Sequence, residues 1–157
     1  LQQDATACRA GCASCCYLPV AVPPGLAGLI AEYVIATLSP PDCEHLVRRL
    51  REAVSFSHTQ TESPPARQRC PLLGEDDRCT IYPVRPIACR AFTSPDYARC
   101  QEVVFGRDRD GGVPQNPAHF RLHQIATAVL QEAASLRGAP NGQRMFAAAL
   151  LEEIEHA

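Results

Sequence analysis

The stretch CRAGCASCC, residues 8–16, places four cysteines within nine positions. A second stretch, CPLLGEDDRCTIYPVRPIACRAF over residues 70–92, adds three more. The nine cysteines of the chain are Cys8, Cys12, Cys15, Cys16, Cys43, Cys70, Cys79, Cys89 and Cys100. They could form a disulfide knot, supply a catalytic thiol with its companions, or act as the ligands of a metal. Most of what the sequence says about fold and function depends on which of these holds.

The number and spacing of the cysteines favour metal ligation over disulfides. An odd count argues against a fully paired secreted framework. A chain of 157 residues, 46% of them hydrophobic, can bury a core without covalent cross-links. Cys15 and Cys16 are adjacent, and a disulfide between neighbours is strained. We therefore expect reduced thiols, a cytoplasmic location and a bound metal.

The spacings Cys8-x3-Cys12 and Cys12-x2-Cys15 fit loops that supply two thiolates each to a tetrahedral metal. The predicted ligands are Cys8, Cys12, Cys15, Cys16, Cys70, Cys79, Cys89 and Cys100. Two groups of four along the chain could make two separate sites or one shared polynuclear site. The adjacent pair favours a composite site, because neighbouring side chains diverge in extended backbone. Cys43 lies in a predicted helix and is expected to be a small core residue.

Arginine provides all the formal positive charge, because the chain has no lysine among its 15 basic residues. Four thiolates on a divalent ion leave a net charge of about −2, which a buried site must offset. Arg85 and Arg90 lie close to Cys89 in the sequence. We expect their guanidinium groups to donate hydrogen bonds to ligand sulfurs.

Apolar residues at helical spacing predict a mainly α protein in one domain spanning 1–157. The predicted helices cover residues 26–38, from Ser39 or Asp42 to 56, 94–105, 116–138 and 143–155. Six prolines between residues 63 and 95 exclude a long helix or a central strand there. No strand pair is expected. The scaffold is thus a small helical one that holds two irregular cysteine-rich segments, 8–16 and 70–100, which a metal would stabilise.

With these residues in view, the chain resembles the YkgJ-type cysteine-cluster family, whose members are described as zinc- or iron-chelating domains. The matching positions are Cys8, Cys12, Cys15, Cys16, Cys70, Leu72, Cys79, Ile81, Tyr82, Arg85, Pro86, Cys89, Arg90 and Phe92. The resemblance covers residues 8–16 and 70–92 and implies binding of zinc or iron. Related motifs occur in flagellin lysine methylases, which implies that an iron–sulfur cluster is an alternative. Cys100 lies beyond the motif, and its role as a ligand is inferred from its position.

The function we expect is chelation of zinc, or of iron, with a structural, metal-handling or partner-docking role. The alternative is an iron–sulfur protein acting in redox chemistry or as part of a modification enzyme. Cys8, Cys12 and Cys15 also match the spacing of radical S-adenosylmethionine enzymes, but those enzymes need a large α/β barrel. His119 and His123 lie one helical turn apart and are interpreted as surface or packing residues. No catalytic residue is assigned, and enzyme activity stays open.

Bulk properties limit the partners of the chain to a metal ion and an unidentified protein. The net charge of −2 gives no general attraction to nucleic acid or anionic lipid. No apolar run approaches the ~20 residues of a membrane span. We therefore expect neither nucleic-acid binding nor membrane insertion.

Overall fold

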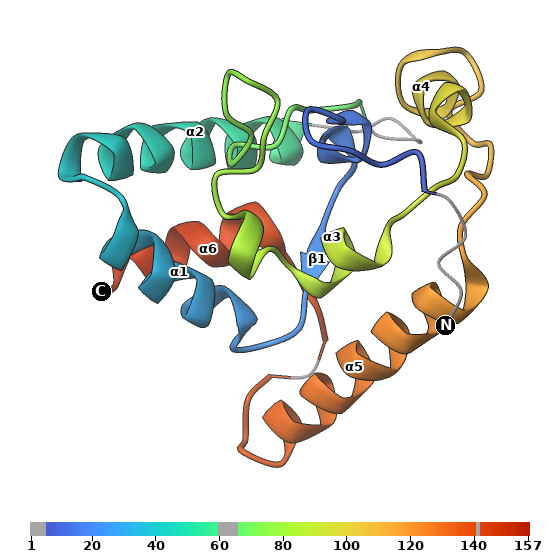
Figure 1. Ribbon diagram of the computed structural model, residues 1–157. Helices are drawn as coiled ribbons and strands as arrows, with labels where there is room; N and C mark the ends of the chain where they lie inside the picture. The colour runs from blue at the N-terminus through green and yellow to red at the C-terminus, as the bar shows by residue number, and fades with distance from the viewer. Residues whose placement is uncertain (1–5, 60–65, 141) are drawn as a thin grey trace.

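The computed structural model describes residues 6–59, 66–140 and 142–157, and it confirms a mainly helical protein (Figure 1). Its longer helices are α1 (Leu26–Thr37), α2 (Pro40–Thr59), α4 (Tyr97–Phe105), α5 (Pro117–Ser135) and α6 (Phe146–Glu155). Its shorter elements are the 3-10 helices η1 (Ser14–Tyr17) and η2 (Tyr82–Val84), the helix α3 (Ile87–Ala91) and the strands β1 (Ala21–Val22) and β2 (Arg144–Met145). Within the described residues, no helix is both long and apolar enough to cross a bilayer.

Side chains that precede the helices explain where several of them begin. The Ser39 hydroxyl accepts a hydrogen bond from the Asp42 N–H at 3.4 Å, so Ser39 caps α2. Asn116 caps α5 by accepting from the His119 N–H at 3.0 Å, with Pro117 as the first helical residue. α4 begins at Tyr97 rather than at 94 as predicted, because Asp96 caps it by accepting a hydrogen bond from the Arg99 N–H at 2.8 Å.

The hydrophobic core lies between α1, α2 and α6, each of which buries one side. Its fully buried side chains include Ile30, Val34, Leu46, Leu50 and Leu150. α1 and α6 approach closely at Gly28, where an added Cβ would lie 3.3 Å from the Glu153 carboxylate. These helices form the base on which the cysteine-rich segments rest.

Two apolar side chains of the proline-rich segment also belong to this core. Leu72 and Ile81 are each only 1% exposed, and both pack with the residues of α1, α2 and α6. Each lies two positions after a cysteine, Cys70 and Cys79 respectively. Burial of these two side chains therefore fixes the backbone next to two of the predicted ligands.

A short antiparallel strand pair, which the sequence did not predict, joins the segment before α1 to the segment before α6. Ala21 of β1 pairs with Met145 of β2, and Val22 pairs with Arg144. The Phe146 N–H extends the pairing by donating to the Val20 carbonyl at 2.8 Å. The expectation of no strand pair was wrong, because two-residue strands leave no periodic pattern in the sequence.

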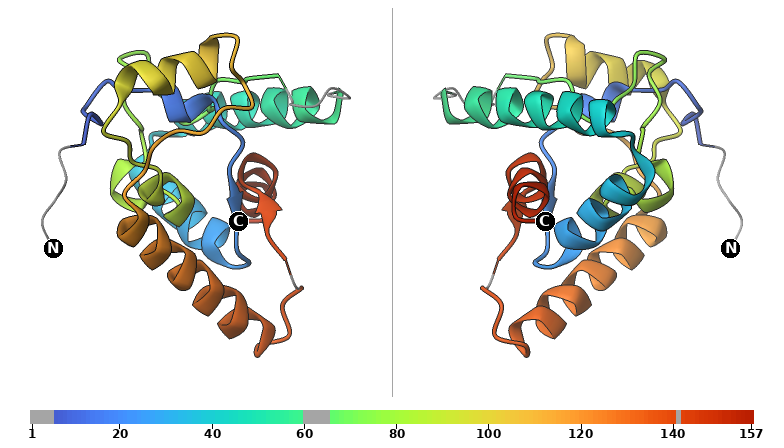
Figure 2. Two further views of the ribbon diagram at one scale, coloured as in Figure 1. Left: turned by 90° about the vertical axis from the view of Figure 1, so that its right-hand side faces the viewer. Right: turned by 90° about the vertical axis from the view of Figure 1, so that its left-hand side faces the viewer.

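α5 stands apart from the three-helix core and packs mainly on α3 (Figure 2). None of its residues is buried, although Leu122, Ile125 and Val129 form an apolar row along it. That row is exposed, whereas the corresponding rows of α1, α2 and α6 face the core.

Replacing Leu50 by Ala tests the core assignment. Leu50 is fully buried, so truncation should lower the free energy of unfolding by about 2–5 kcal/mol. Leu29→Ala is the matched control, because Leu29 is 64% exposed and its truncation should change stability by less than about 0.5 kcal/mol. Urea denaturation followed by circular dichroism measures both. Equal losses would contradict the core as described.

Candidate metal centre

The first cysteine-rich segment is a series of tight turns held by its own backbone. The Cys12 N–H donates to the Arg9 carbonyl at 3.0 Å, and Gly11 between them has a φ of +79°. Glycine adopts this left-handed conformation without a steric penalty. The Cys16 N–H then donates to the Ala13 carbonyl at 2.8 Å as η1 begins. These turns bring the four cysteines of 8–16 into a short, compact path.

A direct backbone bond joins this segment to the second one. The Cys70 N–H donates to the Cys16 carbonyl at 2.8 Å, although 54 residues separate them in the chain. Cys70 and Cys79 are in turn held together by a hairpin-like loop. Within it, Leu73 and Cys79 form an antiparallel bridge, and the Thr80 N–H donates to the Leu72 carbonyl at 2.9 Å.

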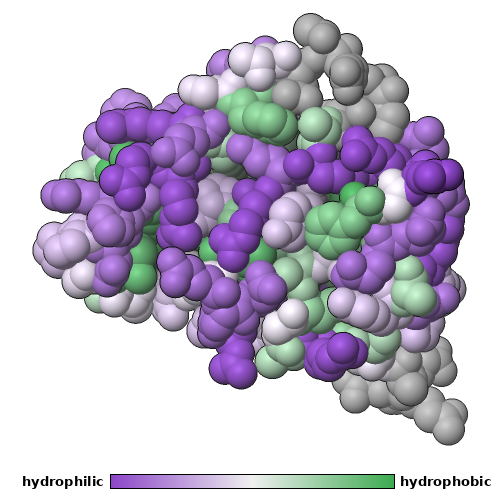
Figure 3. Space-filling model, turned by 90° about the horizontal axis from the view of Figure 1, so that it is seen from above, coloured by the Kyte–Doolittle hydropathy of each residue, from purple (hydrophilic) through white to green (hydrophobic). Residues whose placement is uncertain are grey.

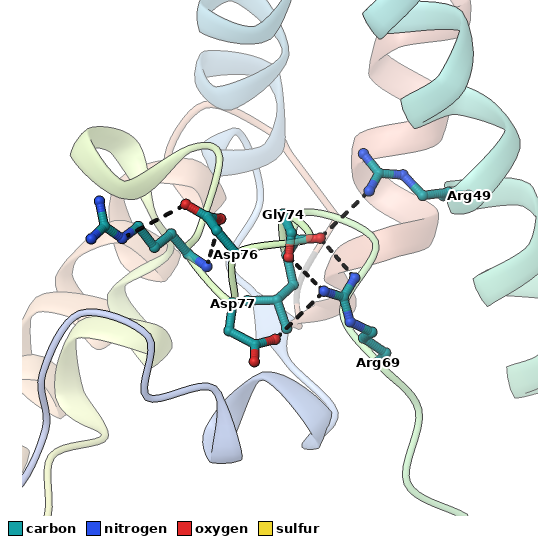
Figure 4. A network of polar contacts seen from close by, with 7 residues as sticks. Arg49, Arg69, Gly74, Asp76 and Asp77 are labelled. Atoms are coloured by element: carbon teal, nitrogen blue, oxygen red, sulfur yellow. Dashed lines mark hydrogen bonds and ion pairs between the residues drawn. The ribbon is translucent and has the colours of Figure 1, made fainter.

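Arginine side chains brace the outside of this loop (Figure 4). Arg69 donates to the carbonyl oxygens of Leu73 at 2.8 Å and Gly74 at 2.5 Å. Its guanidinium also lies 3.6 Å from the Asp77 carboxylate, and Arg49 of α2 reaches the Leu73 carbonyl at 3.5 Å. Carbonyl oxygens at a tight turn lack ladder partners, so these donors satisfy them. Arg69 therefore shapes the loop on which Cys70 and Cys79 lie.

Five thiols from the two segments lie together, four of them within electrostatic reach of one another and the fifth, Cys16, hydrogen-bonded to Cys15; we call them the inner thiols. They are Cys15, Cys16, Cys70, Cys79 and Cys89. The Cys15–Cys16 hydrogen bond, followed by burial, raises the pKa of Cys15. Burial, followed by the neighbouring thiols Cys70, Cys15 and Cys79, raises the pKa of Cys89 to about 12. The pKa values of Cys70 and Cys79 are also raised, chiefly by burial.

Backbone N–H groups lower the pKa of two of the inner thiols. A hydrogen bond from the Leu72 backbone lowers the pKa of Cys70, and one from the Ile81 backbone does the same for Cys79. In both cases the donor is the second residue after the cysteine, whose side chain is buried in the core. Donation to sulfur favours the thiolate, which is the form that binds metals.

The remaining predicted ligands, Cys8, Cys12 and Cys100, form a second group, the outer thiols. The Ser94 N–H donates to the Cys8 sulfur at 3.4 Å. Burial raises the pKa of Cys100 on α4, with further increases from Cys8, Cys12 and Cys15. Cys15 is thus the thiol that faces both groups. The division does not follow the order of the chain, because Cys15 and Cys16 group with the second segment.

Cys43 lies away from both groups. It is on α2 and packs against the hydrophobic core, next to an open hollow that Pro40, Glu44, Val47 and Arg51 also line. All nine cysteines fall within the described residues, and all are free thiols in the structure. This arrangement matches the interpretation of Cys43 as a packing residue.

Arg85 is a cation within electrostatic reach of three inner thiols. Its guanidinium lies 4.0 Å from the centre of the Tyr82 ring, and its charge lowers the pKa of Cys15, Cys79 and Cys89. The Arg85 Nε atom is buried and has no hydrogen-bond partner among the described residues. A buried donor without a partner is costly, so this N–H is available for an anionic sulfur.

Arg90 has a different set of contacts. It donates from Nε to the Arg85 carbonyl at 3.1 Å and from Nη2 to the Pro83 carbonyl at 2.5 Å. These bonds hold the backbone that carries Arg85. Donation from Arg90 to a ligand sulfur stays a prediction.

The two histidines at the start of α5 are engaged in local contacts. His119 Nδ1 lies 3.3 Å from the Thr93 hydroxyl, which ties α5 to the chain after α3. His123 Nδ1 lies 2.9 Å from the His119 carbonyl, so this nitrogen carries the proton. The two rings are in edge contact, with centres 4.4 Å apart.

The thiols are neighbours but do not form a closed coordination shell as they stand. Within residues 6–59, 66–140 and 142–157, no three Cys, His, Asp or Glu side chains converge tightly enough to hold a metal ion. The Cys15–Cys16 hydrogen bond illustrates why, because these two thiols face each other. Rotation of cysteine side chains on an already assembled backbone is what ligation would require.

Residues 7–103 match the family model CxxCxxCC, described as "putative zinc- or iron-chelating domain". The match spans more than half of the chain and includes all nine cysteines. Comparison with curated proteins and with solved structures found no match.

The raised thiol pKa values predict that the metal-free chain loses stability in alkali. The folded state retains protons on Cys89 and its neighbours that the unfolded chain loses above the ordinary pKa of 9.0. Stability should therefore be complete below pH 9 and fall as the pH rises toward 12, the folded pKa of Cys89. The expected slope is at most about 1.4 kcal/mol per pH unit for each such thiol.

Chemical denaturation of the chelator-treated chain from pH 8.5 to 10.5 measures this slope. Cys89→Ser removes one raised group and should make the decline shallower, which separates the thiols from tyrosines and other titrating groups. A free energy of unfolding that stays level or rises over this range would contradict the thiol environment described above.

Proposed function

The chain belongs to the CxxCxxCC family, and we propose that its thiols chelate zinc, or else iron, in one composite centre with a structural or metal-handling role. The observation that carries this proposal is the assembly of five half-buried thiols from two distant segments, with Arg85 beside three of them. Burial and mutual proximity disfavour thiolates, and a bound cation reverses both effects. The proposed protein is a single metal-binding domain spanning 1–157, located in the cytoplasm, where thiols stay reduced.

The donors around the sulfurs fit such a centre. Backbone N–H groups of Leu72, Ile81 and Ser94 are directed at Cys70, Cys79 and Cys8. The Arg85 Nε–H lacks a partner among the described residues. Metal thiolates carry excess negative charge and need donors of this kind. The metal itself would neutralise the thiolates and cross-link the two segments.

We propose the inner thiols as the principal ligands and the outer thiols, Cys8, Cys12 and Cys100, as additional ones. Cys15 is within electrostatic reach of both groups, which supports a shared centre over two independent fingers. Arg85 is proposed to donate to the sulfurs, and Arg90 to hold the Arg85 backbone.

An iron–sulfur cluster is the second candidate, and the number of inner thiols favours it. Four thiolates satisfy one tetrahedral zinc, whereas five are available here. A surplus ligand suits a polynuclear centre or one in which a sulfur bridges two metals. A redox role or a part in a modification enzyme would then follow, with the protein partner still to be identified.

Elemental analysis with a visible absorption spectrum on anaerobically purified protein tests the function directly. Stoichiometric zinc without colour supports the first proposal, and iron with acid-labile sulfide supports the second. Cys15→Ser should lose most of the metal, because Cys15 lies between both thiol groups. Cys43→Ser, the matched control on α2, should retain it. Equal metal content in wild type and Cys15→Ser would overturn the assignment, as would a wild-type protein free of both metals.

Arg85→Gln tests the donor role of the guanidinium. Loss of the donor next to three thiols should weaken metal affinity about 10- to 100-fold. Arg78→Gln is the control, because Arg78 is adjacent to Cys79 in sequence, yet its side chain is 68% exposed and pairs with Asp76. Competition with a chromophoric chelator measures both affinities. Equal affinities in wild type and Arg85→Gln would remove Arg85 from the centre.

A further inference from the structure

α5 lies outside residues 7–103, the part of the chain that the family model matches. It has no buried residue and packs chiefly on the five-residue α3 (Figures 1 and 2). Leu122, Ile125 and Val129 are 59%, 53% and 60% exposed, and Leu136, just after the helix, is 80% exposed. A surface helix of a monomer normally turns such a row toward its own core.

The exposed side chains form one continuous row. Positions 118, 122, 125, 129 and 136 recur at spacings of three, four and seven, which places them on one side of a helix. The half-buried residues of α5, among them His119, His123 and Thr127, lie on the opposite side. α5 therefore uses one side to contact the molecule and leaves its most apolar side facing outward.

The exposed apolar row of α5 differs from the surface over α2 and α4. The face seen in Figure 3 is mainly hydrophilic, with apolar side chains scattered among polar ones. Scattered apolar residues are normal for a protein surface, whereas a contiguous row marks an interaction site. α5 lies on the other side of the molecule in Figure 1.

The charges on α5 indicate what kind of surface the row fits. Arg121 and Glu132 are the only Arg, Lys, Asp or Glu residues between Pro117 and Ser135. Both are exposed, and neither forms an ion pair within the described part of the chain. Helical geometry puts them on the same flank of the row, about 16 Å apart along the axis. If a second copy of this helix runs antiparallel to the first, the cation of each helix lies beside the anion of the other.

We propose that α5 pairs with α5 of a second copy of this chain, antiparallel, about a two-fold axis between Ile125 and Val129. In that register, Ile125 packs against Val129 of the second copy and the small Ala118 against the large Leu136. Arg121 then lies beside Glu132 of the second copy, and the two-fold axis repeats this contact. A parallel pair would place Arg121 opposite Arg121, which is repulsive. The opposite charges therefore select the antiparallel arrangement.

Sedimentation velocity of the full chain under reducing conditions tests the proposal, with reductant present so that the thiols cannot cross-link copies. The wild type should be a dimer that dissociates on dilution. Ile125→Asp should be monomeric at the same concentration, with unchanged helical circular dichroism, because Ile125 contacts no core. Leu29→Asp, an equally exposed apolar site on α1, should stay dimeric. A wild type that is monomeric up to high concentration, or a dimer that Ile125→Asp leaves intact, would overturn the proposal.

Charge exchange tests the antiparallel register. Arg121→Glu alone, or Glu132→Arg alone, places like charges together at two symmetry-related contacts and should weaken the dimer about tenfold at low salt. The double variant Arg121→Glu with Glu132→Arg restores both pairs and should regain wild-type affinity. Additive losses in the double variant would exclude this antiparallel pairing.

Discussion

The hydrogen bond from the Cys70 N–H to the Cys16 carbonyl oxygen is the contact on which the arrangement of the thiols depends. It brings together two segments that have little regular structure of their own. Burial of Leu72 and Ile81 in the helical core holds the second segment in place, and each of these residues follows a cysteine by two positions. The thiol positions are therefore set by backbone and core packing. Metal binding would therefore require rotation of the cysteine side chains but no rearrangement of the backbone.

Without a bound cation, the proximity of these thiols to one another disfavours their deprotonation to thiolates. Burial and neighbouring thiols raise the pKa of Cys89 and Cys70, while Arg85 lowers that of Cys89, and the Leu72 backbone N–H and Arg69 lower that of Cys70. The net effect is a raised pKa at both Cys70 and Cys89, so metal binding at these sulfurs must release protons. Arg85 supplies a positive charge next to the sulfurs, and its stacking on Tyr82 holds it there. The site thus combines high thiol density with partial charge compensation.

The two proposed activities occupy different parts of the molecule. The inner thiols lie on η1, the 70–79 loop and α3, whereas α5 packs on α3 and carries an exposed apolar row. The Thr93–His119 contact and the packing of α3 on α5 connect them, because Cys89 is itself on α3. Residues 7–103 have the features of the family, and α5 adds a surface of its own.

Apolar periodicity, capping residues such as Asn116 and cysteine spacing are local signals, and they were enough to predict the longer helices, the family and the set of candidate cysteines, though not the short helix α3. The sequence had no means to predict that Cys15 and Cys16 group with Cys70, or that Cys100 joins Cys8 and Cys12. The pairing of β1 with β2 was not predicted either, nor was the exposure of the apolar row on α5 to solvent. These features appear only in the folded chain, because each depends on contacts between segments far apart in the sequence. Such contacts come from backbone hydrogen bonds and shared burial, which leave no periodic pattern in either segment.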